Sequence, residues 1–239
     1  MFEFDTYMQR KAPPEEAQPK LFIVPISSDR GLCGSINSNI VREVKDFIKT
    51  NGRKNCKILV VGDKGSAGLL RNFPDCMEQC TSDLGSPMNF ELISSIADRV
   101  ATLSEGHHKI LIFYNEYVSA IRTDIKRMEM MPRKRFYETM KFQKSYEMAE
   151  PDAITSIPAI YELYLSSSLW RAALHNVASE TSARMNAMEN ASKNAKEMIA
   201  KLDLQKNKAR QARITMELCE IISGASALWS SFYKSPFNK

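Results

Sequence analysis

The fold of this chain is decided by residues 188–216, whose sequence is MENASKNAKEMIAKLDLQKNKARQARITM. Small or apolar side chains recur along it at alternating steps of three and four residues, and charged side chains fill many of the other positions. A seven-residue repeat of this kind is the signature of a coiled-coil seam. The predicted seam contains Met188, Ala191, Ala195, Met198, Leu202, Ala209, Ala212 and Met216.

The same register extends from Leu174 to Cys219, inside a run from 159 to 235 that holds no proline and only one glycine, Gly224. A helix of roughly 70 residues is about 105 Å long, much longer than a compact domain is wide. Such a helix must project beyond its own domain or break, and the run has no proline to break it. We therefore expect one very long C-terminal helix that needs a partner along its seam.

The residues before this helix alternate between short apolar runs and amphipathic stretches. The runs Leu21–Ile26, Lys57–Val61 and His108–Tyr114 have the length and composition of buried strands. Strands that alternate with helices predict a mainly parallel sheet with right-handed crossovers, so the fold class is α/β and Rossmann-like. Residues 117–136 are predicted to form an extended hairpin or arm.

The composition of each segment and the positions of its prolines suggest how the chain is divided. We expect an N-terminal arm or linker at 1–20, an α/β domain at 21–157, the long helix at 158–232 and a tail at 233–239. Three prolines and four acids make the arm unlike a secretory signal or a transit peptide. The sequence has no apolar run of about 18 residues, so we expect no membrane-spanning segment.

The overall balance of the sequence is that of an ordinary soluble protein, with 44% apolar residues, 26% charged residues and a formal net charge of +5. It has five cysteines, and no two of them are separated by just two residues. This favours a reducing compartment over a disulfide framework.

Two glycine-containing loops stand where an α/β fold can bind phosphate, namely 27–35 and 62–66. The first lacks the three-glycine pattern of a dinucleotide site, and the second does not complete a nucleotide loop. Structural turns explain both loops better than a nucleotide site does. We expect no cofactor.

Catalytic and metal chemistry also find little support. Cys33 precedes a predicted helix, where a thiol can be activated, but no base is evident for it. The three histidines are His107, His108 and His175; the first two would point to opposite faces of a strand, and the third has no ligand one turn away. We therefore expect no catalytic residue and no metal site.

Basic residues gather in two places. The segment 126–135 lacks the aromatic platforms that stack nucleic-acid bases, so a solvated hairpin is favoured over nucleic-acid binding. Residues 201–213 carry five basic side chains against one acid, a local charge of +4 on the long helix. Because Ala209 and Ala212 share these turns, this basic collar is the predicted point of contact with another protein.

Four motifs in this sequence are similar to those of a known family, the gamma subunit of the rotary ATP synthase in its mitochondrial form. They are Ser28-Asp29-Arg30-Gly31-Leu32-Cys33-Gly34, Gly62-Asp63-Lys64, Ser182-Ala183-Arg184-Met185-Asn186-Ala187-Met188, and the stretch from Asn207 to Thr215 that continues through 217–225. The resemblance covers residues 21 to about 228.

The resemblance implies a non-catalytic rotor. In that family the long helix is a shaft inside a ring of alpha and beta subunits, and the α/β domain is a foot on the membrane rotor ring beside small central-stalk subunits. The pair matching Arg210 and Gln211 contacts a loop of the beta subunit, which also carries the catalytic sites. A peripheral position on the matrix side of the mitochondrial inner membrane is implied.

The family also has an N-terminal helix that pairs antiparallel with the C-terminal one, and residues 1–20 match none of it. On this reading the long helix is half of an antiparallel coiled coil and its seam is partly uncovered. The leading functional expectation is a shaft that couples proton translocation to ATP synthesis by rotation. The alternative is a divergent, non-coupling or regulatory paralogue that only binds ATP synthase subunits.

Overall fold

A computed structural model describes residues 19–85, 88–141 and 153–233. The chain divides into two compact units, 1–187 and 188–239. The arm expected at 1–20 and the tail expected at 233–239 lie almost wholly outside the described residues.

The first unit is built on a five-stranded sheet. Its strands are β1 (Leu21–Pro25), β2 (Cys56–Val61), β3 (Met77–Thr81), β4 (Lys109–Tyr117) and β5 (Thr123–Met130). They stand in the order β3-β2-β1-β4-β5, and all neighbours are parallel except β4 and β5, which form an antiparallel hairpin. The prediction of a mainly parallel α/β sheet is confirmed.

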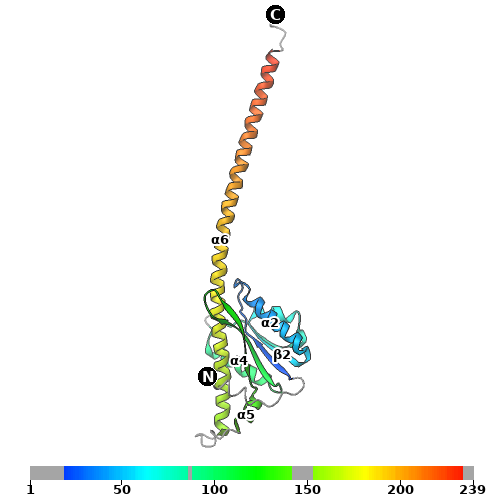
Figure 1. Ribbon diagram of the computed structural model, residues 1–239, viewed down its shortest axis with the longest axis vertical. Helices are drawn as coiled ribbons and strands as arrows, with labels where there is room; N and C mark the ends of the chain where they lie inside the picture. The colour runs from blue at the N-terminus through cyan, green and yellow to red at the C-terminus, as the bar shows by residue number, and fades with distance from the viewer. Residues whose placement is uncertain (1–18, 86–87, 142–152, 234–239) are drawn as a thin grey trace. The chain divides into compact units, whose positions relative to one another are not determined.

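Helices cover both faces of this sheet (Figure 1). One face packs against α2 (Ile36–Asn51) and α3 (Asp63–Leu70). The other packs against α4 (Phe90–Leu103), α5 (Arg133–Lys141) and the first part of α6 (Ala153–Tyr233). Two short 3₁₀ turns, Arg53–Asn55 and Pro74–Cys76, lead into β2 and β3. The central strands are apolar at nearly every position because helices cover them on both sides. Their apolar runs could therefore be recognised as buried strands in the sequence.

Some elements differ from the expectation. The edge strand β3 was not predicted, because its sequence MEQCT is half polar and its side chains are only partly covered. The segment 117–136 does form a hairpin with β4, but its last residues begin helix α5. Helix α6 begins at Ala153 and not at the expected residue 158, so Pro158 lies within its second turn.

The second unit is the part of α6 from Met188 onward. Every described side chain from 188 to 229 is exposed. Two ion pairs along it, Glu189 with Lys193 at 2.8 Å and Arg213 with Glu217 at 3.0 Å, join residues four apart on the same helix. Within the described residues, no helix combines the length and the apolar character that a membrane span requires.

Four of the five cysteines bear on a test of this packing. Cys56 and Cys76 are buried, whereas Cys80 and Cys219 are exposed. Burial, reinforced by the nearby Cys76, raises the pKa of the Cys56 thiol to about 11. Because only the thiolate attacks alkylating reagents, Cys56 stays protonated and unreactive at pH 8.

We therefore expect iodoacetamide at pH 8 to modify Cys80 and Cys219 in the native chain while Cys56 stays unmodified. Peptide mass spectrometry measures this directly. Addition of denaturant should make Cys56 react as fast as Cys219, since unfolding returns its pKa to the ordinary range. Equal reaction of Cys56 and Cys219 in the native chain would contradict the packing of β2.

Candidate functional site: a polar sheet edge and an exposed helix

The glycine-containing loop after β2 is held by the loop that follows β1. The first three backbone N–H groups of α3 donate to this neighbouring loop: Asp63 to the Asp29 carboxylate at 2.9 Å, Lys64 to the Ser28 carbonyl at 3.1 Å and Gly65 to the Ser27 hydroxyl at 2.9 Å. A phosphate at a helix N-terminus needs these same donors. They are already engaged inside the chain, so the geometry favours the structural reading of this loop.

Gly62 is required by the closeness of the two loops. It has a φ of +102°, and a Cβ placed on it would lie 2.5 Å from the Ser27 hydroxyl and 2.6 Å from the Ser27 carbonyl oxygen. No side chain fits there without moving the backbone of β1's exit. This glycine, which suggests a nucleotide loop in the sequence, instead lets two loops pack against each other.

Asp29 joins three loops at the carboxyl edge of the sheet. Its carboxylate accepts the Asp63 amide on one oxygen and the Leu84 amide on the other, at 2.9 and 2.8 Å. The acid thus links the exits of β1, β2 and β3. Its position explains why an Asp stands in this loop without any catalytic partner.

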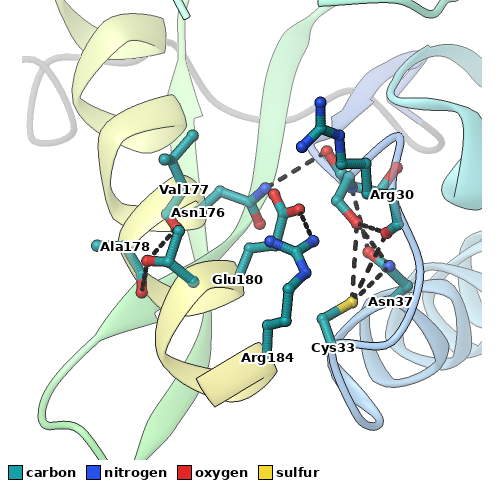
Figure 2. Close-up of polar contacts among 11 residues, drawn as sticks. Arg30, Cys33, Asn37, Asn176, Val177, Ala178, Glu180 and Arg184 are labelled. Carbon is teal, nitrogen blue, oxygen red and sulfur yellow. Dashed lines mark hydrogen bonds and ion pairs between the residues drawn. The ribbon is translucent and has the colours of Figure 1, made fainter. Parts of the chain in front are cut away.

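Cys33 belongs to the same network. It is 2% exposed, and its sulfur accepts a hydrogen bond from the Asn37 side-chain amide at 3.2 Å. The same amide donates to the Ser28 hydroxyl at 2.7 Å (Figure 2). These contacts are structural hydrogen bonds between buried and half-buried side chains, and they do not pair the thiol with a general base. Among the described residues, no cluster of three or more His, Cys, Asp and Glu side chains could hold a metal ion.

Helix α6 enters this edge between β1 and β4. The Asn176 side chain donates a hydrogen bond to the backbone carbonyl of Ser27 at 3.3 Å and accepts one from the side-chain amide of Asn115 at 2.9 Å. One turn later the Ser179 hydroxyl donates to the Asn115 carbonyl at 3.1 Å. Figure 2 shows Asn176 reaching from α6 toward the loop that carries Arg30 and Cys33. None of these α6 contacts was predicted, because a polar residue in a helix does not reveal its distant partner.

The hairpin tip between β4 and β5 also contacts α6. The Ala120 carbonyl accepts hydrogen bonds from the Ser182 hydroxyl at 2.7 Å and from the Asn186 side-chain amide at 2.6 Å. These two bonds tie the helix turns from Ser182 to Asn186 to the hairpin. Glu180 and Arg184, which form an ion pair in Figure 2, line a cleft of about 500 Å³ beside it. The cleft's other charged residues, Asp29, Arg30 and Asp83, give it both signs, so it does not select an anion.

The predicted seam lies wholly on the exposed part of α6. The large seam side chains are 44 to 65% exposed: Met188, Met198, Leu202 and Met216. The four seam alanines, Ala191, Ala195, Ala209 and Ala212, are exposed as well. Apolar residues off the seam are equally uncovered, among them Ile199, Leu204, Ile214, Leu218, Ile221 and Ile222. A helix that is apolar on several faces is normally enclosed on several faces.

Arg210 and Gln211 lie on this same stretch and are exposed. Within the described residues, Arg210 makes no hydrogen bond or ion pair, whereas Arg213 one turn away is paired with Glu217. The guanidinium of Arg210 therefore keeps its donors available. The pair lies between the seam residues Ala209 and Ala212.

Comparison with known proteins fits this geometry. A family model described as ATP synthase matches residues 3–228. The mitochondrial ATP synthase F(1) complex subunit gamma of Dictyostelium discoideum is 33% identical over 235 residues, which cover 95% of this chain and 74% of that protein. The chain belongs to the ATP synthase gamma-subunit family.

Further members of the gamma-subunit family agree. The mitochondrial gamma subunit of Saccharomyces cerevisiae is 36% identical over 218 residues, 90% of this chain and 68% of its own length. A chain of the central stalk and c-ring structure of Tetrahymena thermophila mitochondrial ATP synthase superposes with a TM-score of 0.72 at 40% identity, covering 80% of this chain and 84% of that one. A chain of the Euglena gracilis mitochondrial ATP synthase structure superposes with a TM-score of 0.77 at 22% identity. The match covers 98% of this chain and 79% of that one, and it supports the fold.

Proposed function

We propose that this chain is the central-stalk gamma subunit of a mitochondrial-type ATP synthase, and that it couples proton translocation to ATP synthesis by rotating inside a ring of alpha and beta subunits. The observation that carries the proposal is the helix from 188 to 229, which exposes apolar side chains on several faces in a member of the gamma family. A surrounding ring is the kind of partner that covers such a helix on all sides.

The chain is proposed to be non-catalytic. Its two phosphate-like loops bind each other, because the N-terminal donors of α3 are engaged by residues 27–29. Nucleotide chemistry would then belong to the beta subunits, and this chain would need no cofactor and no nucleic acid. Its task is mechanical.

The α/β domain is proposed to bind the partners other than the alpha and beta subunits. We assign residues 21–157 to a foot that meets the membrane rotor ring and the small central-stalk subunits, and the helix from 158 to 232 to the shaft. The relatives named mitochondrial and the central-stalk structure of Tetrahymena support a peripheral position on the matrix side of the inner membrane. Arg210 and Gln211 are the proposed contact with a beta-subunit loop.

Reconstitution with alpha and beta subunits from the same source tests this function. We expect the full chain to assemble with the ring and to raise its ATP hydrolysis above that of the ring alone. Met198→Asp, on the seam, should lose assembly, because it buries an unpaired carboxylate. Asn194→Asp adds the same charge off the seam, where the native side chain is already polar, and should disturb assembly far less.

Two results would count against the proposal. Failure of the parent chain to assemble would remove the rotor assignment. Assembly without any effect on hydrolysis would favour a paralogue that binds the ring but does not couple.

A further inference from the structure

The point where α6 meets the sheet is the switch point of the sheet's topology. From β1 the chain builds β2 and β3 on one side, and it then crosses to place β4 on the other side. In open α/β sheets, the crevice beyond the carboxyl ends of two such strands is where a ligand binds. Here Ser27 follows β1 and Asn115 lies near the end of β4, so both border that crevice.

This chain's own helix occupies part of the crevice, beside the cleft that Glu180 and Arg184 line. Asn176 bridges the Ser27 carbonyl and the Asn115 amide, and Ser179 bonds the Asn115 carbonyl, with distances between 2.9 and 3.3 Å. All four residues are at most 2% exposed. We call Ser27, Asn115, Asn176 and Ser179 the polar lock. It stands between a mainly apolar contact of α6 with the sheet domain, made by Tyr161, Leu165, Leu169, Ala172 and Ala173, and the exposed hydrogen bonds of Ser182 and Asn186 to Ala120.

The polar lock supplies something that this apolar contact lacks. Burial of apolar area is non-directional, so by itself it penalises a small turn of a helix less sharply than hydrogen bonds do. Hydrogen bonds require a narrow range of distance and angle, and a buried amide left unpaired is costly. A small rotation of α6 would break all three bonds of the lock together.

We propose that the polar lock fixes the rotational register of α6 on the sheet and is the contact through which torque passes between the α/β domain and the long helix. The torque part rests on the proposed rotor function. Ser27, Asn115, Asn176 and Ser179 act as positioning residues, and they hold the base of the helix against twisting.

The register can be measured on the full chain without any partner. Labels at Thr181 on α6 and Lys54 on the domain, introduced as unnatural amino acids and diluted with unlabelled chain, report one intramolecular distance by pulsed electron resonance. We expect a single narrow distribution in the parent. The pair Asn115→Leu with Asn176→Leu keeps the branched skeleton of four heavy atoms in each side chain but removes two of the three bonds, and it should broaden or split the distribution.

Ser179→Ala tests the third bond of the lock, and Ser104→Ala is its matched control. Each removes one buried serine bond to a backbone carbonyl, at 3.1 Å to Asn115 and at 3.2 Å to Ala101, and both serines are fully buried. Both should lower the melting temperature by a similar amount. Only Ser179→Ala should broaden the distance distribution. Equal, narrow distributions in all variants would overturn the proposed lock.

The torque step is tested in the assembled complex, with the ring fixed to a surface and a bead on the α/β domain. The bead's angular variance should rise in the Asn115→Leu, Asn176→Leu pair and stay at the parent value in Ser104→Ala. Unchanged variance would overturn the torque assignment. If the parent does not assemble, the rotor function is wrong, while the distance measurement still decides whether the lock sets the register.

Discussion

Replacing Gly62 by alanine is expected to lower the free energy of unfolding by about 3 kcal/mol or more. Two costs combine: a non-glycine residue in a backbone conformation that L side chains rarely adopt costs roughly 1–3 kcal/mol, and overpacking typically costs another 1–3 kcal/mol. The new Cβ would stand 2.5 Å from the Ser27 hydroxyl and 2.6 Å from its carbonyl oxygen. Backbone cannot move aside as a flexible side chain can, so the β1 and β2 exits must separate.

Urea unfolding followed by the fluorescence of Trp170 measures this loss, because Trp170 packs against Phe90 with ring centroids 5.8 Å apart. A Trp229→Phe background removes the exposed second tryptophan. Gly34→Ala is the matched control: Gly34 has a φ of +64°, but a Cβ there meets nothing within 4 Å. It should cost only about 1 kcal/mol. Equal losses at both glycines would mean that the close approach to Ser27 is unimportant.

Changing Arg210 and Gln211 together to alanine is expected to leave folding intact and to weaken coupled ATP hydrolysis by about tenfold or more. Neither side chain packs against the described chain, so the melting temperature should not change. A guanidinium can hold a carboxylate with two parallel hydrogen bonds, and hydrogen bonds to charged groups contribute roughly 1.5–3 kcal/mol. Gln211 adds a donor and an acceptor beside it.

The matched control for this pair is Lys206→Ala with Asn207→Ala, which removes another cation and amide from the same exposed collar. It should behave nearly like the parent, because exposed charges contribute little by themselves. Arg210→Lys should stay impaired, since an ammonium lacks the planar fork of donors. If the Arg210, Gln211 double variant assembles and turns over like the parent while Met216→Asp does not, seam packing alone carries the interaction.

The central strands could be predicted from the sequence because their side chains meet one kind of environment, and the long helix could be predicted because the run from 159 to 235 holds no proline and only one glycine. β1, β2 and β4 are buried on both faces, so their apolar runs are uninterrupted. β3 lies at the sheet edge with half-covered side chains, and its mixed composition carries no comparable signal.

The polar lock could not be predicted, because its meaning depends on contacts far apart in sequence. Asn176 and Ser27 are 149 positions apart, and only the sheet order brings them together. The buried face of α6 runs through Tyr161, Leu165, Leu169 and Ala172 to Asn176. The seam register extended back to Leu174 marks a different face, since Leu174 is 47% exposed. One helix therefore changes its buried stripe where it leaves the sheet.

The exposed methionines of the long helix give an unassembled chain a limited lifetime. Met188, Met198 and Met216 are 44, 63 and 65% exposed, so oxidants reach their sulfur atoms. Oxidation converts each flexible apolar side chain into a polar sulfoxide, which no longer suits a tightly packed apolar contact. A chain that waits too long for its partners would lose its capacity to join them. Methionine sulfoxide at these positions would therefore mark the copies that stayed unassembled.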